Sequence, residues 1–183
     1  MNKISLEKLM SPVQPTWCPG CGNFSILTAL KQALVELNLA MEEVVLVFGI
    51  GCSGNIADFI KCYGLHALHG RGLANAIGIK LANHRQKVIM LGGDGDIYGE
   101  GLNHLVAACR GNHDLTTLVF NNHRYSLTTG QSSPTSLKGT ISKSTPQGLI
   151  EEPLTALSMA IGSGASFVAR AYAGKLKQMV ELI

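Results

Sequence analysis

Two clusters of polar residues in this sequence each follow an apolar run of strand length. The first is Gly-Gly-Asp-Gly-Asp at residues 92–96, and the second is Asn-Asn at residues 121–122. The interval between them has room for one helix and a return strand, so parallel pairing would bring Asp94 and Asn122 to the edge where open α/β sheets bind ligands. Carboxylate and amide oxygens suit a Mg²⁺ that also holds phosphate oxygens, and glycine lets backbone approach a phosphate closely. This spacing favours a diphosphate-and-magnesium site over a plain strand-to-helix turn followed by a polar loop.

Three cysteines lie in two glycine-rich turns and form a second candidate site. Cys18 and Cys21 belong to Trp-Cys-Pro-Gly-Cys-Gly, and Cys52 follows the apolar residues 44–48. Two thiolates three positions apart can face one metal centre, and a third can join from a distant loop. The alternatives are a zinc site, a thioredoxin-like redox pair and a structural disulfide. Zinc would need a second CxxC or a histidine pair, a redox pair would follow a strand, and an odd cysteine count without a secretory signal disfavours a disulfide framework.

The elements that must position these residues alternate between strand and helix patterns. We predict an α/β fold, an open and mostly parallel sheet flanked by helices. The expected strands are 44–50, 88–91, 115–120 and 165–171. The expected helices are 24–38 (with Asn23 as a possible N-cap), 72–83, 101–110, 154–161 and 176–183. Residues 126–147 are polar and read as a long active-site loop. The chain ends inside an amphipathic pattern, which we interpret as a truncation.

Size and composition limit the classes of function. With 183 residues and 46% hydrophobic content, the chain is expected to form one domain, 1–183, with a cysteine-bearing segment 1–23 and an active-site loop 123–147. Charged residues make up 15% of the chain and the net charge is +3, so nothing indicates nucleic-acid binding. No apolar stretch reaches the roughly 18 residues of a membrane span, so we expect a cytoplasmic protein. Low charge and 21 glycines suggest that much of the surface meets other subunits of a hetero-oligomer.

Taken together, the motifs resemble those of the thiamine diphosphate (TPP)-binding β subunit of 2-oxoacid:ferredoxin oxidoreductases. The family pattern WCPGCG, GIGCS, HGR, GDGD and NN is matched in order, at residues 17–22, 49–53, 69–71, 93–96 and 121–122. The resemblance continues through residues 125–135 and so covers nearly the whole chain. It implies the diphosphate-binding domain fold of TPP enzymes.

The resemblance also implies two inorganic sites. Mg²⁺ would be held by Asp94, Asn122 and the backbone carbonyl of Arg124. A four-iron, four-sulfur cluster would be ligated by the three cysteines named above, Cys18, Cys21 and Cys52. The family's fourth cysteine lies further towards the carboxyl terminus than Ile183. The other cysteines are Cys62, a weak candidate ligand, and Cys109, which we interpret as a buried thiol within a helix.

Further residues are expected to contact the TPP. Gly93, Gly95 and Asp96 would line the diphosphate turn, and His69 and Arg71 could touch phosphate or the cluster loop. Thr128 and Gln131 would line the loop beyond the metal, and Leu127 would wedge between the two rings of the cofactor. The competing interpretations are helix capping for His69 and simple loop anchoring for Leu127.

The activity implied by the resemblance is the oxidative decarboxylation of a 2-oxo acid to acyl-coenzyme A, with electrons passing through the cluster to ferredoxin. TPP enzymes use a glutamate on a separate pyrimidine-binding domain, which this chain is too short to contain. We therefore predict an α subunit that supplies it. Asn55 stands where some family members carry a basic residue, so the particular 2-oxo acid stays open. Two other readings are a subunit of a TPP-dependent non-redox decarboxylase or synthase, and a non-catalytic TPP-binding fragment.

Overall fold

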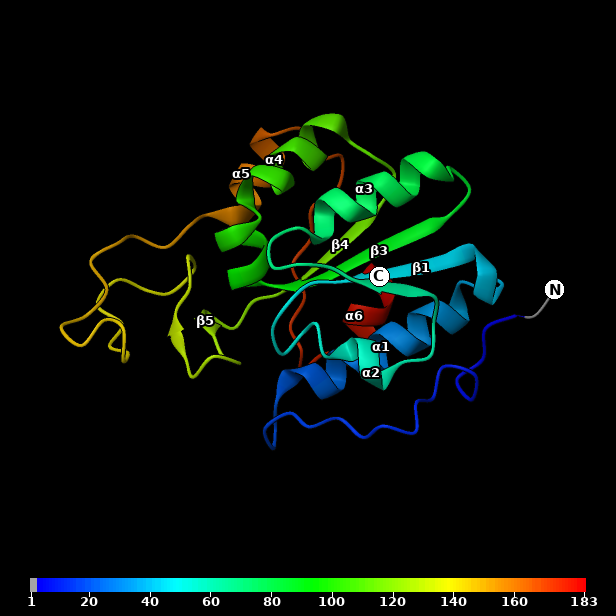
Figure 1. Ribbon diagram of the computed structural model, residues 1–183, viewed down its shortest axis with the longest axis horizontal. Helices are drawn as coiled ribbons and strands as arrows, with labels where there is room; N and C mark the ends of the chain where they lie inside the picture. The colour runs from blue at the N-terminus through cyan, green and yellow to red at the C-terminus, as the bar shows by residue number, and fades with distance from the viewer. Residues whose placement is uncertain (1–2) are drawn as a thin grey trace.

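A four-stranded parallel sheet forms the centre of the computed structural model, which describes residues 3–183 (Figure 1). The strand order is β2 (Gly64–His66), β1 (Val44–Phe48), β3 (Lys87–Gly93) and β4 (Thr116–Phe120). Every neighbouring pair is parallel. The predicted α/β class with an open parallel sheet is confirmed.

The central strands β1 and β3 are continuous apolar runs because both of their faces are covered. Val44, Leu46 and Val47 are fully buried, as is Leu91 on β3. The register pairs Phe48 with Leu91 and Gly93 with Phe120. The residues that follow these strands therefore leave the sheet at one edge, as the sequence predicted for the two polar clusters.

Helices cover the two faces of the sheet in separate layers (Figure 1). On one face lie α1 (Gly22–Glu36), the short α2 (Ile56–Phe59) and α6 (Leu176–Leu182); on the other lie α3 (Gly72–Ala82), α4 (Leu102–Gly111) and α5 (Ala156–Gly162). Each layer has its own apolar core. The first includes Leu30, Leu34, Leu46 and Leu91, and the second includes Leu73, Ala76, Val47, Met90 and Leu105.

The prediction of a strand at residues 165–171 is wrong. This segment forms no β-ladder with any described residue and runs between α5 and α6 without regular structure. A strand needs a hydrogen-bonding neighbour, and the described sheet ends at β4 instead. The apolar side chain of Phe167 in this segment is 71% exposed and does not pack in either core.

Other elements differ from prediction at their ends or were not predicted. Helix α1 begins at Gly22, with Cys21 rather than Asn23 at its N-cap position. Strand β1 ends at Phe48, two residues before the predicted end, where the backbone turns into a loop. The unpredicted elements are β2, the 3₁₀ turn η1 (Met41–Glu43), the π-helical η2 (Gly95–Glu100), and a hairpin of β5 (Arg124–Tyr125) with β6 (Gln131–Ser132).

The amino-terminal segment crosses the outer side of α1 and α2 before it enters α1 (Figure 1). Isolated bridges join Lys3 to Ala40 and Met10 to Ile60, and Leu9 is fully buried. Residues 1 and 2 of the predicted cysteine-bearing segment 1–23 lie outside the described residues. From residue 3 onward, no helix combines the length and the apolar character that crossing a bilayer requires.

Candidate functional site

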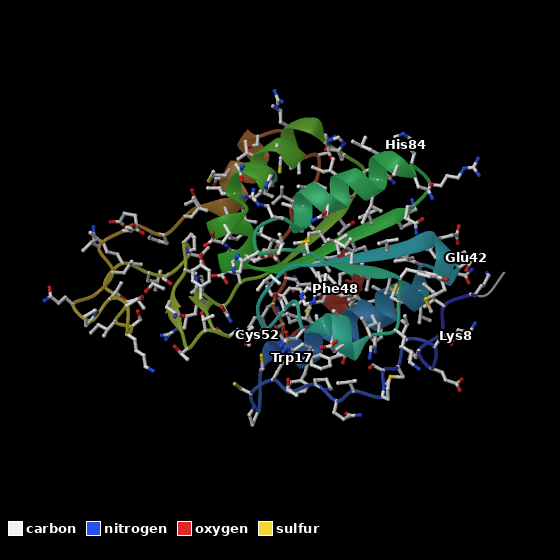
Figure 2. The ribbon with its side chains drawn as sticks, in the orientation of Figure 1. Lys8, Trp17, Glu42, Phe48, Cys52 and His84 are labelled. Carbon is white, nitrogen blue, oxygen red and sulfur yellow. The ribbon has the colours of Figure 1, made fainter. Side chains whose placement is uncertain are left out.

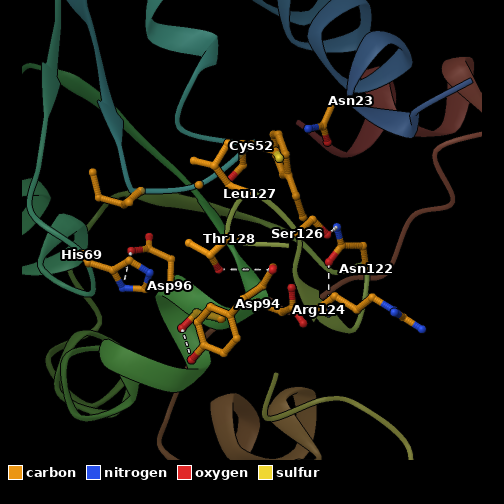
Figure 3. A pocket seen from close by; sticks show the side chains of 17 residues that line it. Asn23, Cys52, His69, Asp94, Asp96, Asn122, Arg124, Ser126, Leu127 and Thr128 are labelled. Atoms are coloured by element: carbon orange, nitrogen blue, oxygen red, sulfur yellow. Dashed lines mark hydrogen bonds and ion pairs between the residues drawn. The ribbon is translucent and has the colours of Figure 1, made fainter. Parts of the chain in front are cut away.

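A pocket opens at the edge of the sheet where the strands end (Figure 3). Its walls come from the loop after β1, the turn after β3, the residues that follow β4, His69 and Asn23. Ten of the predicted site residues line it, namely Cys52, His69, Gly93, Asp94, Gly95, Asp96, Asn122, Arg124, Leu127 and Thr128. Arg71, Gln131, Cys18 and Cys21 are not among the lining residues.

Asp94 follows directly after β3 and is only 1% exposed. The hydroxyls of Ser133 and Thr135 donate hydrogen bonds of 2.5 Å and 2.7 Å to its Oδ2. Because both bonds fall on Oδ2, the Oδ1 atom remains available for a ligand in the pocket. Sequence reasoning did not assign Ser133 and Thr135 a role, since 39 and 41 residues separate them from Asp94.

Of the two asparagines after β4, Asn122 lines the pocket and Asn121 does not. Asn122 Oδ1 accepts a hydrogen bond of 3.1 Å from the backbone N–H of Arg124, and its Nδ2 donates to Ser126 Oγ at 2.8 Å. Asn121 Oδ1 accepts from Thr135 Oγ1 at 2.8 Å. Thr135 has one hydroxyl hydrogen, so it can donate to Asp94 or to Asn121 but not to both at once. This shared hydroxyl couples the turn after β3 to the loop after β4.

One carboxylate, one amide oxygen and backbone carbonyls are the oxygen donors that Mg²⁺ prefers. Asp94, Asn122 and Arg124 all lie at the pocket (Figure 3), and Asn122 Oδ1 keeps a second lone pair beside its bond to Arg124. The residues therefore fit a metal-bound diphosphate. Gly95 is required by packing, because a Cβ atom there would lie 2.4 Å from the Tyr125 ring, whereas one on Gly93 would lie 3.5 Å from Ser53 Oγ.

Asp96 lies beneath the pocket and is 2% exposed. Its Oδ1 accepts a hydrogen bond of 2.7 Å from the backbone N–H of Gly70, and His69 Nδ1 lies 3.5 Å from the same oxygen. Burial raises the pKa of the Asp96 carboxyl, and the N–H groups of Gly70 and Ile50 and the charge of His69 act in the opposite direction. Asp96 thus fastens the loops after β1, β2 and β3 to one another.

His69 lines the pocket and Arg71 does not, although the sequence predicted that both reach the site. The His69 ring stacks on Tyr125 with centroids 6.1 Å apart and lines the pocket. The Tyr125 hydroxyl donates to the carbonyl of Gly95 at 3.2 Å. Arg71 instead places Nη1 2.7 Å from His104 Nε2, away from the pocket.

The CxxC segment approaches the loop that carries Cys52, since Trp17 and Cys52 lie next to each other (Figure 2). Trp17 Nε1 donates a hydrogen bond of 2.7 Å to the Cys52 carbonyl, which joins the CxxC segment to the loop after β1. Burial raises the pKa of the Cys52 thiol, and the charges of Cys21 and Cys18 raise it further. The thiols are thus close enough to affect one another. Across residues 3–183, however, no group of three or more His, Cys, Asp or Glu side chains has the spacing to hold a metal ion.

The other two cysteines pack in the apolar cores. Cys62 lies against the first core, where burial raises its pKa to about 11, and Cys109 is buried in the second. Neither lines the pocket. Across residues 3–183, the cysteines therefore form no complete set of cluster ligands.

Leu127 and Thr128 lie in the loop that closes the pocket between β5 and β6. Leu127 is 53% exposed although it is apolar, and it lies across the pocket from Asp94 (Figure 3). Thr128 Oγ1 donates to Gln131 Oε1 at 2.7 Å, so Gln131 supports the loop rather than lining the pocket. Asn23 and Ser53 also face the pocket, and sequence reasoning had not assigned either of them to it.

Comparison with known proteins gives a consistent result. Residues 49–183 match the family "Thiamine pyrophosphate enzyme, C-terminal TPP binding domain". A 2-oxoacid:ferredoxin oxidoreductase subunit beta from Saccharolobus solfataricus is 53% identical over 169 residues, which are 91% of this chain and 55% of that protein. Subunit beta of 2-oxoacid:ferredoxin oxidoreductase 1 from Aeropyrum pernix is 48% identical over 100% of this chain and 58% of that protein.

A solved structure is similar over almost the whole chain. It is the 2-oxoglutarate:ferredoxin oxidoreductase from Magnetococcus marinus with 2-oxoglutarate, coenzyme A and succinyl-CoA bound. The TM-score is 0.94 and the sequence identity is 39%, covering 97% of this chain and 61% of that chain. The present chain therefore spans less than two thirds of the length of these relatives.

Proposed function

This chain belongs to the C-terminal TPP-binding domain family of thiamine pyrophosphate enzymes, and from that premise we propose that it is the β subunit of a 2-oxoacid:ferredoxin oxidoreductase. The reaction is the oxidative decarboxylation of a 2-oxo acid to acyl-coenzyme A, with ferredoxin as electron acceptor. The observation that carries the proposal is Asp94, buried at the end of β3, with Oδ1 left available beside Asn122. Relatives named as β subunits of this enzyme support it.

In this proposal Asp94, Asn122 and the carbonyl of Arg124 would hold a Mg²⁺ that neutralises the charge of the TPP diphosphate. We assign Gly93 and Gly95 to the turn that faces the diphosphate, and His69 lies at the same pocket. TPP supplies an electron sink for the carbon that loses carbon dioxide. The chain binds and orients this cofactor, and Leu127 offers an apolar surface to its rings.

We assign Cys18, Cys21 and Cys52 to an iron–sulfur cluster beside the TPP. Cys52 lines the pocket, and the bond from Trp17 draws the CxxC segment towards it. A subunit without electron transfer would have no use for three thiols at this place. A cytoplasmic location is consistent with five cysteines that form no disulfide.

The remaining parts of the reaction are assigned to a partner. No glutamate among residues 3–183 lines the pocket, and we assign that carboxylate to an α subunit with a pyrimidine-binding domain, across an interface. Ferredoxin and coenzyme A complete the set of partners. The substrate is assigned as a 2-oxo acid without further distinction, because Asn55, at the position that is basic in some members, does not line the pocket.

The test is anaerobic co-expression with the α subunit, followed by quantification of iron, sulfide and TPP in the purified complex. We expect one TPP and about four irons per αβ unit, as a cubane cluster requires. TPP without iron would instead indicate a non-redox decarboxylase or synthase, or a non-catalytic fragment. A complex that binds no TPP would overturn the assignment altogether.

A further inference from the structure

The loop after β4 contains one residue that packs against the neighbouring element η2. Residues 121–129 are all exposed except Tyr125, which is half-buried. A Cβ atom added to Gly95 would lie 2.4 Å from the Tyr125 ring, and one added to Gly99 would lie 2.1 Å from its hydroxyl oxygen. Neither glycine has a positive φ, so the space that they leave serves the ring and not a special backbone conformation. Gly95 and Gly99 thus form a notch in η2 that Tyr125 fills.

Two further contacts hold the ring in this notch. The Tyr125 hydroxyl donates a hydrogen bond of 3.2 Å to the Gly95 carbonyl. On its other side the ring stacks on His69, with centroids 6.1 Å apart, and His69 Nδ1 lies 3.5 Å from Asp96 Oδ1 in η2. Tyr125 is therefore enclosed by η2 and by a histidine that is itself fastened to η2.

Fixing Tyr125 also fixes the carbonyl that precedes it. The Arg124 carbonyl and the Tyr125 N–H belong to one peptide unit, which is planar, so the position of Tyr125 limits the direction in which this carbonyl points. The backbone on the other side of Tyr125 is held as well. Its own carbonyl accepts from the Gly130 N–H at 2.9 Å, and the residue pairs with Gln131 across the β5–β6 hairpin.

The Arg124 carbonyl is one of the three groups that the proposed function assigns to Mg²⁺. This ion demands a nearly ideal octahedron with short bonds, whereas Ca²⁺ accepts longer bonds and variable geometry. We propose that Tyr125 is a positioning residue: by filling the notch of η2, it places the Arg124 carbonyl where Mg²⁺ requires it. Tyr125 acts through its neighbour and is not assigned as a ligand. This inference rests on the proposed function.

The test measures binding of TPP to the chain by calorimetry, once with Mg²⁺ and once with Ca²⁺. In Tyr125→Ala we expect the Kd for TPP with Mg²⁺ to rise roughly ten- to a hundredfold, as for the loss of a group that orients a metal ligand. The Kd with Ca²⁺ should rise by a smaller factor, because Ca²⁺ tolerates a displaced carbonyl. Tyr125→Phe keeps the ring in the notch and should retain most of the affinity with both ions.

Gly99→Ala tests the same contact from the other side. Gly99 does not line the pocket, and its added Cβ would meet the Tyr125 hydroxyl oxygen first, with the next atom, Cζ of the same ring, at 3.3 Å. We expect Gly99→Ala to weaken binding more with Mg²⁺ than with Ca²⁺. The double variant Gly99→Ala/Tyr125→Phe lacks the obstructing oxygen and should regain affinity. Gly78→Ala is the matched control, because an added Cβ there has nothing within 4 Å.

The outcomes separate this inference from the proposed function. If circular dichroism shows that Tyr125→Ala does not fold, Gly99→Ala and its double variant decide. An unchanged Kd in a folded variant, or an equal loss with Mg²⁺ and Ca²⁺, would overturn the inference and leave the proposed function standing. Failure of the double variant to regain affinity would also overturn it. If the wild-type chain binds TPP with neither ion, the inference and the proposed function fail together.

Discussion

At the scale of single residues, the site depends on which oxygen of Asp94 is already engaged. Ser133 donates to Oδ2, and the Thr135 hydroxyl, shared with Asn121, lies 2.7 Å from the same oxygen, so neither contact occupies Oδ1. A carboxylate held by outer hydrogen bonds keeps its metal-binding geometry before the metal arrives. The support comes from the segment after β6, which the sequence had indicated only as a polar loop.

The first prediction concerns this carboxylate. We expect Asp94→Asn to weaken Mg²⁺-dependent TPP binding by more than about a hundredfold, because changes to outer-shell partners alone cost about 10- to 100-fold in metal affinity. Asp58→Asn is the control, since Asp58 is exposed and lies outside the pocket. Isothermal titration with TPP at fixed Mg²⁺ makes the comparison. Equal affinities in the two variants would contradict the metal-binding role of Asp94.

The second prediction concerns the thiols. We expect Cys52→Ala, purified anaerobically with the α subunit, to lose most of its iron, whereas Cys109→Ala keeps it. Cys109 is the suitable control because it is buried in the second core, away from the pocket. Iron and acid-labile sulfide are measured per complex. Full iron content in Cys52→Ala would remove this cysteine from the set of ligands.

At the scale of elements, Asp96 connects loops that follow three different strands. Its carboxylate accepts from the Gly70 N–H, lies near His69, and packs directly against the backbone of Gly49 at the end of β1. Glycine is needed at position 49 because the carboxylate fills the space of a side chain. The pocket therefore depends on a contact of Gly49 that the spacing of apolar residues does not predict.

The third prediction tests this contact. Gly49→Ala would place a Cβ atom 1.8 Å from Asp96 Oδ2, so we expect a loss of about 1–3 kcal/mol in the free energy of unfolding, as in overpacked cores. Gly78→Ala is the matched control, because position 78 in α3 has nothing within 4 Å of an added Cβ. That helical substitution should stabilise by about 0.5–1 kcal/mol. Urea denaturation measures the free energy of unfolding of both variants. An unchanged value for Gly49→Ala would show that the loops after β1 and β3 are free to move apart.

The fourth prediction concerns the ion pair that joins α3 to the turn before β4. Lys80 is buried, and its Nζ donates to Asp114 Oδ2 at 2.6 Å and to the Gln86 carbonyl at 2.8 Å. The hydrogen bond and charge of Lys80 lower the pKa of Asp114. A lowered carboxyl pKa in the folded state contributes stability above the unfolded pKa, about 3.9, and this contribution is lost as the pH falls below that value.

We therefore expect Asp114→Asn to be less stable than the wild type at pH 6, with the difference shrinking on acidification below about pH 4. The pH-dependent part should amount to at most about 1 kcal/mol, because the Asp114 carboxylate is largely exposed to water. Thermal denaturation between pH 6 and pH 3 follows the difference. If the difference in stability between Asp114→Asn and the wild type stays constant across this range, Lys80 does not stabilise the fold through the charge of Asp114.

At the scale of the whole molecule, the part of the pocket built by residues 3–183 offers carboxylate and amide oxygens and one thiol, that of Cys52, but no glutamate. The residues that close it, including Leu127, leave apolar surface exposed. These features fit the proposal that a partner subunit completes the site. It agrees with the family that the ordered motifs resemble and with the relatives that carry its name.

The fifth prediction follows from this division. We expect the chain alone to show no 2-oxo acid oxidation with TPP, Mg²⁺, coenzyme A and an artificial electron acceptor, and to gain activity when co-purified with the α subunit. The complex with Asp94→Asn is the inactive control for the assay. Turnover by the isolated chain would refute the requirement for a partner.

The sequence by itself determined the elements and residue types that act locally. The apolar runs of β1, β3 and β4 and the polar clusters after them could be predicted because strand length and turn chemistry are read within a few residues. The ordered motifs identified the family, which the comparisons confirm. The order of strands along the chain also sufficed to predict that Asp94 and Asn122 lie at one edge.

Only the tertiary structure decided which of these residues meet. Arg71 turns to His104, 33 positions away, and Asp96 binds the backbone of Gly70, 26 positions away. The predicted strand at 165–171 has no partner in the described sheet, although its local pattern suits a strand. These outcomes depend on contacts between distant segments, and the free energy of such contacts is set by packing that local periodicity does not encode.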